Sequence, residues 1–104
     1  MTLRVTAGAR RDALRTERRL EREQSGFGTA FSDLFEAAVS AIRSTPRQHA
    51  PTDDGPDGIE TREVFLARFN QRVIYAVRDT EVVILAVVHA HSHPGAGVGR
   101  VEQV

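Results

Sequence analysis

The chain has 104 residues, no cysteine, and fourteen basic against fourteen acidic side chains, so its formal net charge is zero. A chain of this length buries about two-thirds of its unfolded surface, so we expect one domain over residues 1–104, with 95–104 as a flexible tail. The balanced charge excludes the strongly basic surface of a general nucleic-acid-coating protein. No apolar run approaches the roughly 20 residues of a membrane helix, and no secretory signal is present. We therefore expect a cytoplasmic protein without a membrane partner.

The first part of the chain predicts an edge strand followed by a charged helix. Residues 3–6 alternate apolar and polar side chains, as a short strand does. Residues 9–24 contain no Gly or Pro and are rich in Arg, Glu and Leu, which favour a helix. The outer face of this helix is either a solvated surface with i,i+4 ion pairs or a docking surface for an acidic or amphipathic partner. For the second interpretation, the candidate docking residues are Arg15, Arg18 and Arg22.

A second helix is predicted from Thr29, as N-cap, to Ser44, with Pro46 ending it. Apolar side chains recur at three-to-four spacing and form one wide stripe, which indicates a core-facing helix. The members of the stripe are Phe27, Phe31, Leu34, Phe35, Ala38 and Ile42. Because the connection at residues 25–28 is short, we expect the two helices to form an antiparallel hairpin.

The second half of the chain predicts strands. Residues 47–58 are rich in Asp, Gly and Pro and predict a loop, and residues 59–69 predict a strand that ends in a turn. Residues 73–77 and 82–88 are apolar or aromatic throughout, and the polar break between them indicates a hairpin. Neither run alternates, so both faces of this pair should be covered. The expected fold is α+β, with an N-terminal strand and a helical hairpin packed on a three- to four-stranded antiparallel sheet; residues 98–104 are either a last strand or frayed.

Three histidines follow the last apolar run. If that strand continues, His89, His91 and His93 share one face, and two histidines at this spacing can chelate zinc. No Asp, Glu or Cys lies close in sequence to complete a ligand set, so a metal site is a minor alternative and no cofactor is expected. The His-Ser-His-Pro run resembles the zinc motif of JAMM-type isopeptidases, but the Ser and Asp that follow in that motif are absent from residues 95–104.

The strand region TREVFLARFNQRVIYAVRDTEVVILAVVHAHSHP, with the helix GTAFSDLFEAAVSAIRSTP, resembles the ParE/RelE toxin superfamily, and in particular its ParE, plasmid-stabilisation branch. The resemblance covers about residues 3–94. It implies a bacterial toxin of a type II toxin–antitoxin module, neutralised by a cognate antitoxin and contacting DNA only through it. The ParE branch poisons DNA gyrase, whereas the RelE branch cleaves mRNA on the ribosome.

The residues that the resemblance assigns favour gyrase inhibition. Arg72 matches the strand-three Arg, but the basic pair expected on the preceding strand falls on Glu63 and Phe65, and a later basic position falls on Ser92. A carboxylate and a phenyl ring cannot stabilise the charge that develops at a scissile phosphate. The basic close of the ParE branch is also replaced by the histidine run, which leaves a diverged, non-toxic interaction module as a further alternative.

We therefore expect a binding inhibitor rather than an enzyme. An endoribonuclease is the alternative, for which the candidate catalytic residues are Arg72, His89 and His91. The expected target-binding residues carry basic or hydrogen-bonding side chains on the predicted sheet; they are Arg62, Arg68, Arg72, Tyr75, His91 and His93. The expected antitoxin-binding residues are Arg15, Arg18 and Arg22. A strand arginine such as Arg72 can instead simply pair with a nearby carboxylate, Asp79 or Glu81.

Overall fold

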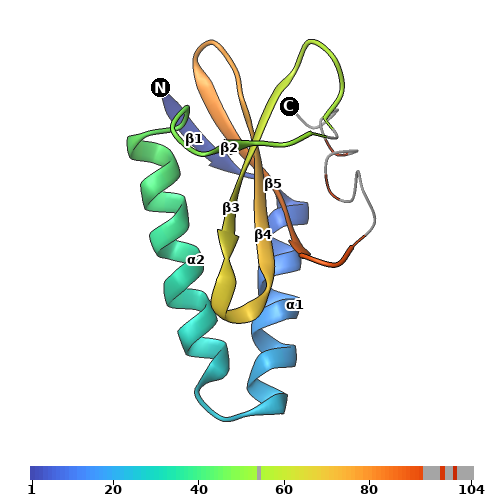
Figure 1. Cartoon of the computed structure of the whole chain (residues 1–104). Coiled ribbons are helices and arrows are strands. Elements are labelled where there is room, and N and C mark those ends of the chain that lie inside the picture. Colours follow the sequence, from blue (N-terminus) through green and yellow to red (C-terminus); the bar gives the residue numbers. More distant parts are fainter. Residues whose placement is uncertain (54, 93–96, 98–99, 101–104) are drawn as a thin grey trace.

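Two helices pack on one face of a five-stranded sheet (Figure 1). This computed structural model describes residues 1–53, 55–92, 97 and 100. The helices are α1 (Ala7–Glu23) and α2 (Phe27–Ser44). The strands are β1 (Thr2–Val5), β2 (Ala50–Pro51), β3 (Glu60–Leu66), β4 (Gln71–Val77) and β5 (Glu81–His89). The predicted α+β class and helical hairpin are confirmed.

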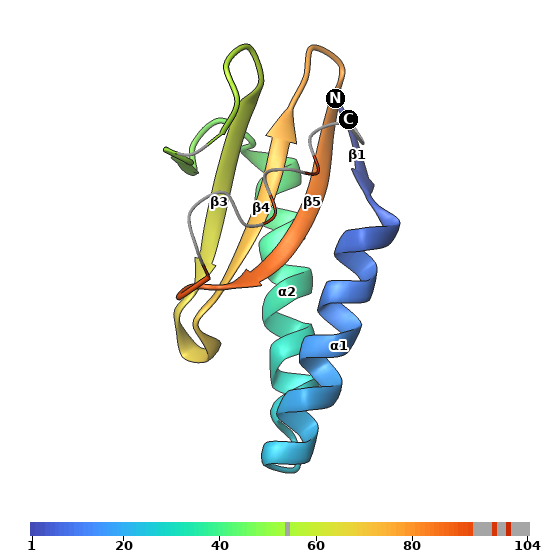
Figure 2. The same ribbon diagram turned by 90° about the vertical axis from the view of Figure 1, so that its right-hand side faces the viewer.

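The sheet has the order β1-β5-β4-β3-β2, and its three central strands form the predicted antiparallel meander (Figure 2). Two features differ from the expected three- to four-stranded antiparallel sheet. First, β1 pairs with β5 in parallel, because the two helices return the chain to the end of the sheet where β1 began. Second, residues Ala50 and Pro51 of the predicted loop pair with Glu63 and Arg62 and form the short edge strand β2.

The helical hairpin is capped differently from the prediction. The hydroxyl of Thr6 caps α1 by accepting a hydrogen bond from the Ala9 N–H at 3.1 Å. Helix α2 begins at Phe27, before Thr29, because its cap comes from α1. The Glu21 carboxylate accepts hydrogen bonds from the N–H groups of Gly26 at 3.1 Å and Gly28 at 3.0 Å. A carboxylate at this position also interacts favourably with the positive end of the helix dipole.

The main core lies between the helices and the sheet. Alternate residues of β4, Val73, Tyr75 and Val77, are buried against the helical hairpin. The apolar stripe predicted for α2 faces them, with its four innermost members buried and Phe27 and Leu34 partly buried against the same core. These four are Phe31, Phe35, Ala38 and Ile42. Helix α1 contributes less to the core, with Ala9 and Leu20 as its buried apolar residues.

The opposite face of the sheet is also buried at its centre, as the lack of alternation predicted. Ile74 and Ala76 of β4 form a second apolar cluster with Val83, Leu85 and Ala86 of β5. The register shifts in this pair, because Ile74 lies opposite Ala86 while the next residue of β4 lies opposite Ile84. Leu85 is therefore the extra residue of a β-bulge. Gly97 lies directly on this cluster, since a β-carbon there would approach Ala86 Cβ to 2.8 Å.

Two strand ends differ from the sequence expectation. The β3 strand stops at Leu66 and continues as a 3-10 turn, Ala67–Phe69, which Asn70 closes in the left-handed conformation with φ 53°. Strand β5 stops at His89, and residues 90–92 form a turn. The predicted tail or last strand after Pro94 falls mostly on residues outside those that the structure describes. Neither α1 nor α2 is long and apolar enough to cross a membrane.

Candidate functional site

The sheet arginine that the family resemblance singles out is held by a cross-strand carboxylate. Arg72 Nε lies 2.7 Å from Glu63 Oε2, and its Nη2 lies 3.0 Å from Glu63 Oε1. The partner is thus Glu63 on β3 rather than Asp79 or Glu81, because the two strands place residues 63 and 72 diagonally on one face. A bidentate pair of this kind is strong and neutralises the guanidinium charge. Phe65, directly opposite Arg72, is 52% exposed and completes this part of the face.

Two other predicted contact residues hold the loop before β3 in place. Arg62 Nε lies 2.7 Å from Glu60 Oε2, and its Nη1 donates to the His49 carbonyl at 2.6 Å. Hydrogen bonding from Arg62, and more weakly from Arg47, lowers the pKa of Glu60. Tyr75 is fully buried, and its hydroxyl donates to the Pro46 carbonyl at 2.6 Å. We expected Tyr75 to contact a target, but its side chain does not reach the surface.

Burial also affects the ionisation of Tyr75. It raises the pKa of the phenol to about 12, because a phenolate in the core would lose its hydration. The phenol therefore stays protonated throughout the physiological range. Its chemical role is to donate a hydrogen bond inside the fold.

The histidines do not form the predicted ladder on one strand face. Strand β5 ends at His89, and the turn that follows lets the His91 N–H donate to His89 Nδ1 at 3.1 Å. The two imidazole ring centres are 5.1 Å apart. His93 lies outside the described residues. Within the described part of the chain, no group of three His, Cys, Asp or Glu residues is placed to hold a metal ion.

One pocket brings together side chains from four elements at the turn between β3 and β4. Its lining includes Arg19, Glu23, Phe27, Arg68, Phe69 and His89. The Arg68 guanidinium lies over the rings of Phe69 at 5.0 Å and Phe27 at 5.6 Å, a cation–π arrangement that leaves the cation at the surface. The Ala90 N–H donates to the Asn70 carbonyl at 2.7 Å, which fixes the end of β5 against this turn. Arg68 and His89, both singled out from the sequence, thus lie at the same pocket.

A second surface lies on α1, where arginines surround an exposed leucine. Arg11, Arg15, Arg18 and Arg22 line a shallow hollow around Leu14, which is 44% exposed. We call this set the α1 arginine face. It contains all three predicted antitoxin-binding residues and adds Arg11 and Leu14. The four arginines follow helical spacing, so the sequence contains the signal that would have identified Arg11 as the fourth member.

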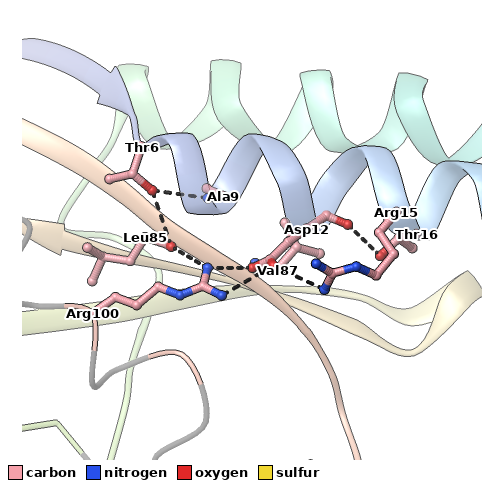
Figure 3. A network of polar contacts seen from close by, with 8 residues as sticks. All are labelled: Thr6, Ala9, Asp12, Arg15, Thr16, Leu85, Val87 and Arg100. Carbon is pink, nitrogen blue, oxygen red and sulfur yellow. Dashed lines mark hydrogen bonds and ion pairs between the residues drawn. The ribbon is translucent and has the colours of Figure 1, made fainter.

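A buried carboxylate that the sequence did not single out links α1 to β5 and to Arg100 (Figure 3). Asp12 Oδ2 accepts hydrogen bonds from the Val87 N–H at 3.0 Å and from Arg100 Nη1 at 2.7 Å, and its side chain is only 7% exposed. Arg100 Nη1 also donates to the Leu85 carbonyl at the bulge, at 3.2 Å. The network therefore holds Arg100 against the first helix.

The fold has a match among solved structures. No protein-family model matches the chain, and no curated protein matches it in sequence. A chain of the solved structure described as "Chromosomal ParDE TA system from P. aeruginosa" superposes with a TM-score of 0.72 and 20% sequence identity. The match covers 88% of this chain and 97% of the other. The chain has the same fold as this chain of the ParDE structure.

This fold confirms, at the level of architecture, the resemblance that residues 61–94 suggested. The fold match rests on the backbone arrangement and is independent of the side chains at the candidate site. Among the described residues, this fold brings no three metal-ligating side chains together. What they offer is two partly charged contact surfaces, the pocket at Arg68 and the α1 arginine face.

Proposed function

We propose that this chain is a ParE-type toxin of a type II toxin–antitoxin module, and that it acts by binding its target rather than by catalysis. The observation that carries the proposal is the fold likeness to a chain of a ParDE toxin–antitoxin structure over 88% of the sequence. The strand pattern in residues 61–94 and the order of the elements support the same assignment.

The electrostatics of the sheet favour binding over RNA cleavage. A ribonuclease of this fold needs uncompensated positive charge where the phosphate reacts. Here the Arg72 guanidinium is held by both oxygens of Glu63, and its neighbour across the strands is Phe65. Basic side chains were expected at positions 63 and 65. Glu63 instead neutralises the charge of Arg72, and Phe65 adds an apolar side chain. We infer gyrase as the target because the ParE branch, which the sequence resembles, acts on it.

The pocket at Arg68 is the best candidate for the target-binding surface. It combines an exposed guanidinium, two aromatic side chains and His89, a combination typical of contacts that contribute most to binding. His91 lies next to His89 and extends the same surface. His93 remains a sequence-based candidate.

The first experiment expresses the chain alone in bacteria and measures growth, plasmid supercoiling and mRNA length. We expect growth arrest with relaxed or cleaved plasmid DNA and intact transcripts. Arg68→Ala should reduce the arrest at least tenfold, whereas Arg78→Ala, at an exposed arginine in the β4–β5 turn, should not. Shortened transcripts with normal supercoiling would show that the chain is a ribonuclease and not a gyrase inhibitor. Normal growth with folded protein would show that it is a non-toxic interaction module.

The α1 arginine face is the proposed docking surface for the antitoxin. Its four guanidinium groups and exposed Leu14 match a helix that carries acidic residues around an apolar anchor. Arg15→Glu, Arg18→Glu and Arg22→Glu together should weaken binding of the co-encoded antitoxin at least 100-fold, because each reversal adds repulsion to a lost attraction. Arg78→Glu, a charge reversal at an exposed arginine away from this face, is the control. Unchanged antitoxin affinity in the triple variant would show that the antitoxin docks on another surface.

A further inference from the structure

The pocket at Arg68 presents a cation that the fold holds in one orientation. The Arg68 guanidinium lies 5.0 Å from the ring centroid of Phe69 and 5.6 Å from that of Phe27. The two rings meet edge to face at 5.5 Å, and Phe69 is only 8% exposed, so this aromatic platform belongs to the core. A guanidinium that stacks by its face keeps the N–H groups at its edge free to donate to a ligand.

Arg68 is an exposed cation without a carboxylate partner among the residues that the structure describes. In this it differs from Arg62 and Arg72 of the sheet, each of which is held by a carboxylate at 2.7 Å. An uncompensated guanidinium with a fixed orientation is suited to bind an anion. A carboxylate fits it well, because its two oxygens match two parallel N–H donors of the guanidinium.

His89 adds a second hydrogen-bond donor to the same pocket. The backbone N–H of His91 donates to His89 Nδ1 at 3.1 Å. Because a backbone N–H can only donate, Nδ1 carries no proton, and the neutral imidazole carries its proton on Nε2. Within the described part of the chain Nε2 makes no hydrogen bond, so it can donate to a ligand. The hydrogen bond from the Ala90 N–H to the Asn70 carbonyl holds this strand end beside the β3–β4 turn (Figure 2).

The rest of the pocket limits which anion it can accept. Two arginines and one glutamate line it, which leaves a single net positive charge when His89 is neutral. The glutamate, Glu23, forms an ion pair with Arg19, whose Nη1 lies 2.8 Å from Glu23 Oε1. The apolar lining consists of Leu20, Phe27 and Phe69. One net charge beside an apolar surface favours a singly charged carboxylate on an aliphatic stem over a phosphate dianion, and a glutamate side chain has this combination.

We propose that the pocket at Arg68 binds a glutamate side chain on the surface of the target protein. Its carboxylate accepts hydrogen bonds from the Arg68 guanidinium and from His89 Nε2, and its methylene groups pack on the apolar lining. This inference rests on the proposed function, in which the pocket contacts the target, and it adds the chemistry of that contact. Glu23 opposes such a ligand, because it places a like charge beside it. Glu23→Gln should therefore strengthen binding, an effect that a merely structural role of these residues would not produce.

The first test does not depend on toxicity. The acetylated and amidated peptide Ala-Glu-Ala-Ala is titrated into the labelled chain and followed by NMR, with Ala-Gln-Ala-Ala and inorganic phosphate as matched probes. We expect the Glu peptide alone to shift the Arg68 Nε–H and His89 amide signals, Glu23→Gln to raise its affinity about threefold, and Arg68→Gln to abolish the shifts. Arg78→Gln, at an exposed arginine in the β4–β5 turn, is the control.

Three results of this titration would overturn the inference. One is an equal response to the Gln peptide, which would show that the carboxylate is not recognised. Another is tighter binding of phosphate, which would assign the pocket to a phosphate group. The third is the absence of shifts at these two residues up to about 10 mM peptide, a concentration that detects even millimolar binding.

The second test uses the growth experiment and separates this inference from the proposed function. Glu23→Gln should arrest growth at a lower expression level than the original chain does. Arg68→Lys should arrest it less, because lysine keeps the charge but loses the paired donors of the guanidinium. Arg78→Lys should change nothing. Equal arrest by all three variants would refute the glutamate contact while the proposed function stands, whereas no arrest by the original chain would refute the proposed function itself.

Discussion

The arginines of the sheet and the arginines of α1 have the same charge but opposite surroundings. Arg62 and Arg72 are largely shielded, and each is held by a carboxylate at 2.7 Å. Arg11, Arg18 and Arg22 line an open hollow, and the described residues provide no ion-pair partner for them. The sheet arginines therefore stabilise the fold, whereas the helix arginines remain available to a partner. Charge counted along the sequence does not distinguish these two cases, because the difference lies in what the fold places beside each guanidinium.

The largest effect on stability should come from the Asp12–Arg100 network. Asp12→Ala removes the acceptor for the Val87 N–H and leaves Arg100 without its carboxylate. Removing one partner of a buried pair costs about 3–5 kcal/mol, and because Arg100 is 35% exposed we expect about 2–3 kcal/mol. Urea unfolding measures this cost, with the exposed Asp33→Ala as a control that should change little. A double-mutant cycle with Arg100→Ala should give a coupling of about 1–2 kcal/mol, and additive effects would contradict the network.

Tyr75 should make stability fall at high pH. Burial raises the phenol pKa to about 12, whereas in the unfolded chain it is about 10. Between these values the folded chain retains a proton that the unfolded chain has lost, so the free energy of unfolding decreases as pH rises from 10 toward 12. Tyr75→Phe should abolish this decrease and cost about 1 kcal/mol at neutral pH through the lost hydrogen bond to Pro46.

The tyrosine prediction can be checked optically. The sequence has one tyrosine and no tryptophan, so phenolate absorbance reports Tyr75 alone. A titration midpoint near 10 in the folded protein would show that the hydroxyl is hydrated rather than buried. Urea unfolding at several pH values gives the matching stability change for the chain and for Tyr75→Phe.

A smaller effect on stability is expected at the Glu63–Arg72 pair, which is the basis for favouring target binding over RNA cleavage. Glu63→Gln weakens the bidentate contact with Arg72 and should lower the free energy of unfolding by about 1 kcal/mol, since the two side chains are only partly exposed. It should not produce mRNA cleavage, because Phe65 and Ser92 still occupy positions expected to be basic. Transcript length after induction provides the measurement, and cleavage by this variant would mean that Glu63 alone suppresses the nuclease.

The smallest effect should come from α1. Replacing Arg11, Arg18 or Arg22 by Gln should change the free energy of unfolding by less than about 0.5 kcal/mol, as is usual at exposed positions. Chemical unfolding of the three single variants tests this. A loss above about 1 kcal/mol in any of them would remove the contrast with the sheet arginines and assign the α1 arginine face a structural role.

Sequence patterns predicted the elements that depend on local composition. The apolar runs 73–77 and 82–88 gave the central hairpin, and the Phe31–Phe35 stripe gave the core face of α2. The helix start at Thr29 was wrong because the actual cap, Glu21, lies on the other helix. Glu21 precedes Gly26 by five positions, and its carboxylate reaches that N–H only because the chain reverses direction between the two helices. The same reason explains β2, whose two residues form a strand only because β3 lies beside them.

Features that depend on register were beyond the sequence. Arg72 was expected to contact a target or, alternatively, to pair with Asp79 or Glu81, but the pairing of β3 with β4 places Glu63 next to it. Tyr75 was expected to contact a target, yet its side chain lies in the core, where its hydroxyl donates a hydrogen bond to the Pro46 carbonyl. Asp12 and Arg100 are 88 positions apart, and only the folded chain brings them into contact.

The parallel pairing of β1 with β5 has a consequence for how the chain folds. Arg4 on β1 and its partner Glu81 are 77 positions apart, while β3, β4 and β5 pair through short connections. Contacts between distant segments form later than local ones, because closing the long loop costs entropy before any contact rewards it. The meander should thus assemble early and the N-terminal strand dock late. Substitutions in β1 are then expected to speed unfolding and leave the folding rate almost unaltered.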